Sequence, residues 1–170
     1  MGVSGCGKST VGVRLAQLLG WEFHDGDDFH PPANKIKQGA GIPLDDHDRR
    51  PWLGAIRAFM EEAHSQGRHL VIPCSALRER YRDWLGRGLP WVQFVHLQGD
   101  KELIRERLKA RTGHFMSPTL LDNQYATLEA PLDALTVDVG PPPESIASEI
   151  ILRLRLRPLA VPKASRPSRS

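Results

Sequence analysis

The sequence is poor in cysteine and contains no long apolar segment, and both absences exclude classes of protein. Only Cys6 and Cys74 are cysteines among 170 residues, and no Cys-x-x-Cys or His-x-x-x-His spacing occurs. Neither a disulfide framework nor a zinc site is therefore indicated. No run approaches the roughly 20 apolar residues that span a bilayer, and no signal-peptide pattern is visible. We expect a cytoplasmic protein without a membrane partner.

Acidic residues are absent from the end of the chain, although the whole chain is nearly balanced in charge. The net charge is +3 at a sequence pI of about 9.1, but residues 157–170 hold Arg157, Lys163, Arg166 and Arg169. Removing these four charges leaves a net charge of −1 on the rest, so we expect no nucleic-acid partner. The composition predicts one domain over residues 1–156 and a disordered basic tail over residues 157–170.

Glycine is concentrated at the start of the chain, in the pattern Gly, four residues, Gly-Lys-Ser. This spacing is typical of a loop that wraps nucleotide phosphates with its backbone N–H groups. In that interpretation Lys8 reaches the β- and γ-phosphates of ATP, and the Ser9 hydroxyl binds Mg²⁺. A glycine-rich turn that matches by chance is the alternative. The predicted nucleotide-binding residues are Gly2, Val3, Ser4, Gly5, Cys6, Gly7, Lys8, Ser9 and Thr10.

Helical and strand patterns alternate along the chain, which indicates an α/β fold with a parallel sheet covered on both faces. A phosphate loop normally follows a buried strand, whereas only Met1 precedes this one, so we expect the first, central strand to be missing. Predicted helices cover residues 8–19, 32–37, 52–65, 75–85, 101–111, 117–126 and 143–154, with Ser75 as an N-cap. Predicted strands cover residues 21–24, 69–74, 91–97 and 135–139.

Polar residues follow the predicted strands at the edge where such sheets bind ligands. Asp25 and Asp27 can hold Mg²⁺ through water or accept a proton from a hydroxyl, and N-capping or a solvated turn is the alternative. Arg49 suits bidentate binding of a carboxylate, with an ion pair to Asp46 or Asp48 as the equally supported alternative.

Two arginines end the predicted helix at residues 101–111. Arg107 and Arg111 lie one turn apart, where they either reach over bound ATP from a segment that closes on the site or form a solvated helix face. His114, in the loop that follows, is ambiguous between the site and the surface.

Several further blocks carry a resemblance to one family. They are Asp25–Pro31, Pro43–Leu53, Cys74–Leu77, Tyr81–Asp83, Arg107–Met116 and Gln124–Glu129. With the phosphate loop, they make residues 1 to about 156 resemble the gluconokinases, small P-loop kinases related to the shikimate and nucleoside monophosphate kinases.

The resemblance implies ATP-dependent phosphorylation of D-gluconate at its 6-hydroxyl, a five-stranded parallel sheet, a lid over about residues 107–126 and a homodimer. It implies that Asp27 is the base or orients the hydroxyl group. It also implies roles in substrate binding for Asp27, His30, Arg49, Ser75, Arg82 and His114. Asp25 and Ser9 would lie near Mg²⁺, Lys8 and Arg111 would act on the transferred group, and Arg107 would serve the nucleotide. The alternatives are another small-molecule kinase of this fold, or a nucleotide-binding protein impaired by the missing strand.

Overall fold

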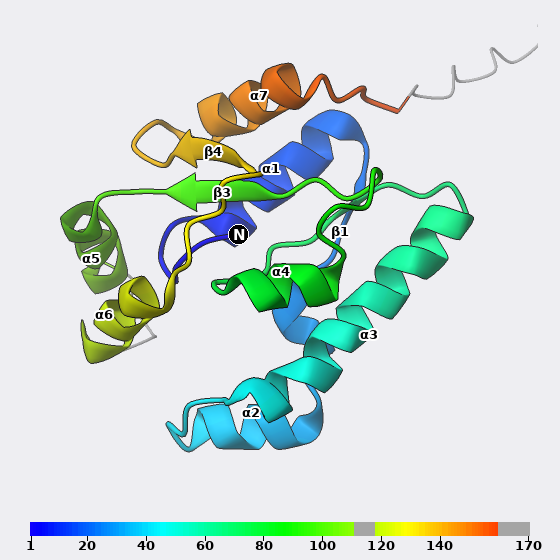
Figure 1. Cartoon of the computed structure of the whole chain (residues 1–170). Coiled ribbons are helices and arrows are strands. Elements are labelled where there is room, and N and C mark those ends of the chain that lie inside the picture. Colours follow the sequence, from blue (N-terminus) through cyan, green and yellow to red (C-terminus); the bar gives the residue numbers. More distant parts are fainter. Residues whose placement is uncertain (111–117, 160–170) are drawn as a thin grey trace, which may run out of the picture.

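The computed structural model describes residues 1–110 and 118–159 (Figure 1). Its described helices are α1 (Lys8–Leu19), η1 (a 3-10 helix, Gly26–Phe29), α2 (Pro32–Gly39), α3 (Asp46–Ser65), α4 (Glu79–Leu85), α5 (Lys101–Lys109), α6 (Pro118–Thr127) and α7 (Pro143–Leu154). Its described strands are β1 (Glu22–Phe23), β2 (Leu70–Val71), β3 (Val95–Gln98) and β4 (Leu135–Asp138). The alternation of strands and helices that the sequence predicts is confirmed.

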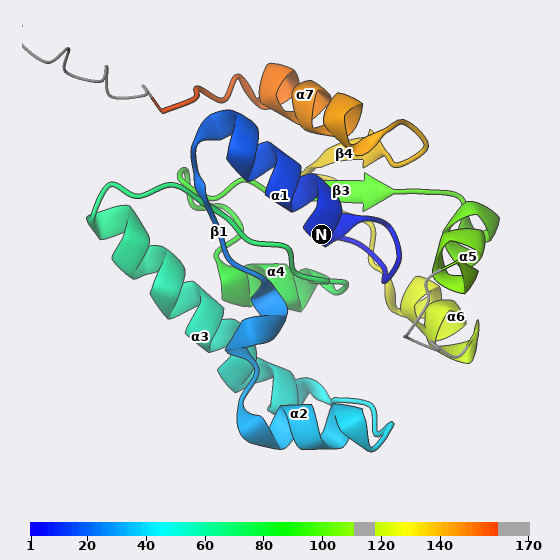
Figure 2. The same ribbon diagram turned by 180° about the vertical axis from the view of Figure 1, so that it is seen from behind.

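The described strands form two parallel pairs. Glu22 is in register with Leu70 in the pair β1–β2, and Val95 is in register with Leu135 in the pair β3–β4. The two views from opposite sides show α1 and α4 on opposite faces of the strands (Figures 1 and 2). This arrangement confirms the predicted α/β class with helices on both faces.

The backbone of the first residues lies between the two strand pairs. The Leu97 N–H donates to the Met1 carbonyl at 3.0 Å, and the Gly2 N–H donates to the Ser75 carbonyl at 3.2 Å. The described residues contain four strands, and the strand that the resemblance places before the phosphate loop is not among them. A mainly apolar cavity of about 560 Å³ lies beside Met1 between the pairs. The phosphate loop therefore begins directly at the point where the pairs meet.

The core consists of two apolar clusters. The larger one joins α1, α7 and the pair β3–β4, and includes Leu19, Ile104 and Ile150, each at most 1% exposed. The smaller one joins α3 and α4 around Leu53 and Ile56. Burying side chains of this size contributes about 1.5–3 kcal/mol each. The larger cluster includes Val3 and Cys6 of the phosphate loop, and Phe29, which follows the acidic turn Asp25–Asp28, packs against the smaller one.

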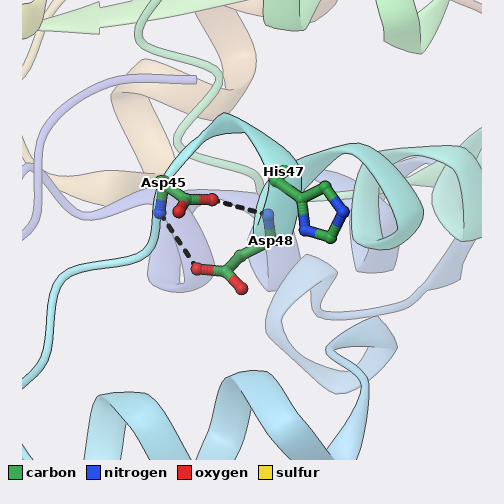
Figure 3. Close-up of side chains that lie close together, drawn as sticks. All are labelled: Asp45, His47 and Asp48. Carbon is green, nitrogen blue, oxygen red and sulfur yellow. Dashed lines mark hydrogen bonds between the residues drawn. The ribbon is translucent and has the colours of Figure 1, made fainter.

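Helix α3 begins at Asp46, earlier than the predicted start at Trp52. The Asp45 carboxylate accepts from the Asp48 N–H at 2.9 Å, and the Asp48 carboxylate accepts from the Asp45 N–H at 3.1 Å (Figure 3). This reciprocal capping box makes residues 46–51, which precede the predicted helix, helical as well. Pro51 consequently lies inside the helix, where it removes one backbone donor.

The prediction that Ser75 caps a helix is wrong. Ala76 has a φ of 43°, in the left-handed region, and α4 begins only at Glu79. A left-handed residue directly after Ser75 breaks any helix that would start there. Segment 73–78 is instead irregular and lines the cavity beside the phosphate loop, and the strand predicted at 69–74 is confirmed only at Leu70–Val71.

The strand predicted at residues 91–97 begins only at Val95, and the strand predicted at residues 21–24 is confined to Glu22–Phe23. Other element ends agree with the sequence prediction. Gly20 ends α1 in the left-handed conformation with a φ of 67°, and Asp100 caps α5 by accepting from the Glu102 N–H at 2.8 Å. The Leu159 N–H donates to the Leu19 carbonyl at 2.8 Å, so the first residues of the predicted tail contact the end of α1. Within the described ranges we find no helix long and apolar enough to cross a membrane.

Candidate active site

One large cavity, of about 990 Å³, opens beside the phosphate loop. Its volume is at the upper end of the usual range for small-molecule sites, about 300–1,000 Å³. It is lined by the loop and the start of α1, by segment 73–78, and by residues of α2–α3 and of α5–α6. It therefore combines the phosphate loop with the acidic turn, as the sequence predicts.

The phosphate loop has the geometry that phosphate oxygens require. Gly5 and Gly7 have φ values of 82° and 92°, which other residues rarely adopt. Gly7 precedes α1 without any side-chain cap, so the first N–H groups of the helix are available to a ligand in the part of the chain that is described. The Lys8 ammonium donates to the Val3 carbonyl at 2.9 Å. Residues Ser4–Ser9 line the cavity, which fits the phosphates of a nucleotide.

Ser9 and Asp25 meet at one edge of the loop. The Ser9 hydroxyl donates to the Asp25 carboxylate at 3.0 Å, and the other Asp25 oxygen accepts from the Asp27 N–H at 3.0 Å. Asp25 thus caps η1, as the alternative interpretation has it, and also offers an oxygen next to the phosphate loop. A hydroxyl and a carboxylate are oxygen ligands of the kind that Mg²⁺ binds, so this pair fits the ion.

Asp27 and His30 line the cavity next to Asp25. Desolvation, and then the neighbouring charge of Asp25, raise the pKa of the Asp27 carboxyl above its usual range. Its side chain is nevertheless 81% exposed, so it faces the open part of the cavity. His30 is buried against Trp52, with ring centroids 3.9 Å apart. Burial lowers the pKa of His30, although the nearby Asp27 acts in the opposite direction.

Arg49 projects into the cavity from the first turns of α3. Its guanidinium lies 5.5 Å from the centre of the Tyr81 ring, and one nitrogen donates to the Tyr81 hydroxyl at 3.4 Å. The carboxylates of the alternative interpretation are engaged elsewhere: Asp48 with Lys37 at 2.6 Å, and Asp46 with Arg80 and the Tyr81 hydroxyl. Hydrogen bonding to Tyr81 lowers the pKa of Asp46. Across the described residues Arg49 forms no ion pair, so it can bind an anion.

Other predicted side chains divide into those that line the cavity and those that do not. Ser75 and Arg107 line it. Arg82 does not: it is 2% exposed, and one nitrogen donates to the Ala76 and Leu77 carbonyls at 3.2 and 3.4 Å. Arg82 thus supports segment 73–78 from behind. Arg111 and His114 lie outside the described residues.

The structure adds three side chains to which the sequence analysis assigned no role. Gln124 accepts from the Ser4 N–H at 2.6 Å and donates to the Ser4 hydroxyl at 3.0 Å, joining α6 to the phosphate loop. The Trp52 indole donates to the Gly26 carbonyl at 2.7 Å, and Asn34 contacts His30. Each interaction joins residues distant in sequence or depends on a ring orientation, so no spacing predicts it.

Asp45, His47 and Asp48 each have one potential metal-ligand atom within 4.8 Å of the others, and they are the only such group of three in the described ranges (Figure 3). Asp45 and Asp48 carry the capping box, and Asp48 also binds the Lys37 ammonium at 2.6 and 2.8 Å. These contacts show that the two carboxylates serve as helix-capping groups.

The fold and the cavity define the class of protein. Parallel strands, a phosphate loop at the start of α1 and a second polar subsite facing that loop are the features of a P-loop kinase for small molecules. Such kinases use a nucleotide as the phosphoryl donor.

Comparison with known proteins then gives the family. The model of the shikimate kinase family matches residues 4–151. A gluconokinase of Gluconobacter oxydans is 44% identical, over 89% of this chain and 86% of its own length. The chain therefore belongs to the shikimate kinase family, and within it to the gluconokinases.

Solved structures agree with this assignment. The crystal structure of a gluconokinase from Sinorhizobium meliloti is 43% identical with a TM-score of 0.79, and the match covers 91% of this chain and 89% of that one. A sugar kinase from a Janibacter species is 42% identical with a TM-score of 0.84, covering 93% of both chains. The resemblance that the sequence motifs carry is thus confirmed.

Proposed function

We propose that this protein transfers the γ-phosphoryl group of ATP to the 6-hydroxyl of D-gluconate, giving 6-phospho-D-gluconate and ADP. The observation that carries the proposal is Arg49, a cation that faces the cavity without a carboxylate partner among the described residues. Gluconate is an acid, and a guanidinium binds a carboxylate with two parallel hydrogen bonds. The relatives named gluconokinase support the same substrate.

The donor side consists of the phosphate loop and its neighbours. Lys8 exchanges its contact with the Val3 carbonyl for the β- and γ-phosphates, and the α1 N-terminus favours the same negative charge. Arg107 reaches the nucleotide from the end of α5, and we propose that Arg111 stabilises the transferred group from the segment that follows. Ser9 and Asp25 would hold Mg²⁺, which neutralises charge on the phosphate oxygens when bound.

The acceptor side positions the sugar acid for in-line attack. Arg49 holds the carboxylate, and Ser75, His30 and His114 contact hydroxyl groups. As the bond from the substrate oxygen to the γ-phosphorus forms and the bond to the bridging oxygen of ADP breaks, the hydroxyl proton passes to Asp27. The raised pKa of Asp27 suits it to accept this proton. Positioning and charge stabilisation supply most of the catalysis in reactions of this kind.

A coupled assay of ADP release tests the proposal. We would compare D-gluconate, shikimate and nucleoside monophosphates as acceptors with ATP and Mg²⁺. Release with gluconate alone is expected, and the Asp27→Asn variant should lose about 100-fold or more in kcat because the general base is gone. ADP release with shikimate or a nucleotide would assign another small-molecule kinase. If none of the acceptors gave ADP release, a nucleotide-binding protein without kinase activity would be favoured.

A further inference from the structure

The His30 ring is fixed in place by its neighbours. It is 6% exposed and stacks on Trp52 with an angle of 20° between the ring planes. The Trp52 indole is itself tied to the acidic turn, because its N–H donates to the Gly26 carbonyl at 2.7 Å. A ring held on its face in this way presents its two nitrogens in fixed directions.

Asn34, on α2, decides which of the two nitrogens carries the proton. Its side-chain nitrogen lies 2.9 Å from the Asp48 carbonyl oxygen and 3.2 Å from Nδ1 of His30. A backbone carbonyl can only accept, so the atom facing it is the amide nitrogen, and the second amide hydrogen is directed at Nδ1. Nδ1 must then accept through its lone pair. A neutral ring in this position carries its hydrogen on Nε2.

The protonated nitrogen faces the carboxylate of Asp27. Nε2 lies 3.8 Å from Asp27 Oδ1, which is too long for a direct hydrogen bond. The gap does let one oxygen atom lie within hydrogen-bonding distance of both groups. A hydroxyl group accepts one hydrogen bond and donates another. If it accepts from Nε2–H, its own hydrogen is turned toward Asp27.

We propose that Asn34 is a positioning residue that fixes His30 as an Nε2–H donor, and that this donor directs the hydroxyl proton of the substrate toward Asp27. The role in turnover rests on the proposed function, whereas the position of the ring proton does not. The opposite tautomer would place a lone pair at Nε2, so the hydroxyl would donate to His30 and turn its oxygen lone pair toward the carboxylate. Asn34, 3% exposed, is well placed to exclude that arrangement.

Nitrogen NMR of the ligand-free protein tests the tautomer without any turnover. Two-bond ¹H–¹⁵N correlations of the ring, assigned by their loss in His30→Gln, should show a protonated Nε2 and a bare Nδ1 in the wild type. In Asn34→Asp the new carboxylate can only accept, so the proton should move to Nδ1. A wild-type ring protonated at Nδ1 would overturn the proposal, and this result needs no variant of Asn34 to fold.

Steady-state kinetics test the consequence. Asn34→Asp should lower kcat for the acid substrate by about tenfold or more and leave the KM for ATP unchanged, because general-base transfer depends on geometry. In a His30→Gln background, where an amide supplies a donor near Nε2 in either case, Asn34→Asp should have little further effect. A tautomer change without a fall in kcat, or an equal fall in both backgrounds, would refute the positioning role. Absence of wild-type gluconate turnover would instead refute the proposed function, and the spectrum would still decide the tautomer.

Discussion

Arg49 is set apart from the other arginines near α3 by what it contacts. Arg80 and Arg78 approach the Asp46 carboxylate, and Arg50 lies over the Trp84 ring at 5.6 Å, outside the cavity. Arg49 alone of these four combines a place in the cavity wall with no carboxylate within salt-bridge distance, in the described part of the chain. The neighbouring Arg50 therefore serves as an internal control for substitutions of Arg49.

We predict that Arg49→Leu raises the KM for gluconate by about 10- to 100-fold, because a hydrogen bond to a charged group contributes about 1.5–3 kcal/mol. The KM for ATP should change little. Arg50→Leu, the matched control, removes the same group from outside the cavity and should leave both constants near the wild-type values. Initial rates at varied gluconate measure the effect, and equal increases in KM for the two variants would contradict the prediction.

Glu22 gives the protein a pH-dependent contribution to stability. The Arg68 guanidinium, and then His24, hold the pKa of the Glu22 carboxyl at about 2, below its usual value of 4.5. Because the folded-state pKa is the lower one, the stabilisation is fully present above about pH 4.5 and is lost as the pH falls toward 2. The carboxylate is partly exposed, so we expect at most about 1 kcal/mol.

We predict that Glu22→Gln lowers the free energy of unfolding at pH 7 and that its difference from the wild type shrinks at pH 3. Urea unfolding at the two pH values measures this. Glu61→Gln removes a carboxylate that is paired with Arg57 and is more exposed than that of Glu22, and serves as the control with a smaller effect. A difference that does not depend on pH would show that the ion pair is not its cause.

At the scale of elements, the capping box decides where α3 begins and hence where Arg49 points. We predict that Asp45→Ala lowers the free energy of unfolding by about 1 kcal/mol, the usual cost of losing an N-cap. It should also raise the KM for gluconate, because the first turn that carries Arg49 loses its start. Asp28→Ala, which removes an exposed carboxylate of η1, is the control for stability. Thermal melts decide the outcome, and equal shifts would count against the cap.

Among the side-chain hydrogen bonds described, only those of Gln124 join helix α6 to the phosphate loop. We predict that Gln124→Leu raises the KM for ATP by about tenfold, since two neutral hydrogen bonds contribute about 1–3 kcal/mol together. Gln124→Glu keeps the acceptor for the Ser4 N–H, so its KM for ATP should lie between those of the wild type and Gln124→Leu. An unchanged KM for ATP in Gln124→Leu would show that the loop holds its shape without α6.

Local signals predicted most of the elements, and they fail where distant contacts decide. Gly20 and Asp100 end and start helices through their own backbone preferences, so both boundaries are correct. Ser75 looks like an N-cap, but the left-handed Ala76 that follows depends on packing against the rest of the site. The predicted start of α3 at Trp52 is too late, because the Asp45–Asp48 spacing forms a capping box and Pro51 lies inside the helix.

The same distinction holds for the site. The phosphate loop, Asp25 and Asp27 follow from motifs within a few residues, and the structure brings them to one cavity. The choice between a carboxylate-binding Arg49 and an ion-paired one could not be made from spacing, because it depends on Lys37, Arg80 and Tyr81 taking the nearby acids. Gln124 is 120 residues from Ser4, so only the fold joins them.

At the scale of the whole molecule, each apolar cluster contains one of the two thiols. Cys6 belongs to the larger cluster and is 1% exposed, and Cys74 belongs to the smaller one and is 7% exposed. Burial raises the pKa of the Cys74 thiol to about 11. Reaction of this thiol with a disulfide reagent is therefore slow until the surrounding cluster opens, because the thiolate is the nucleophile.

We predict that neither thiol reacts with an aromatic disulfide reagent at pH 8 while the protein is folded, and that both react at once in denaturant. Cys74→Ala leaves a reporter of the larger cluster, and Cys6→Ala leaves a reporter of the smaller one. Different labelling rates at low denaturant would show that the two halves open separately. Immediate labelling of the native protein would contradict the burial on which the prediction depends.

The acceptor side of the cavity comes largely from one uninterrupted stretch of the chain. Asp27, His30, Arg49 and Trp52 all lie within 26 consecutive residues, whereas the proposed donor side draws on segments far apart. With this arrangement, the preference for an acceptor substrate can be transferred from one related kinase to another. Exchange of this one stretch between relatives, by recombination or by a designed graft, would then move most of the residues that we propose bind the acid, while the phosphate loop stays in the host.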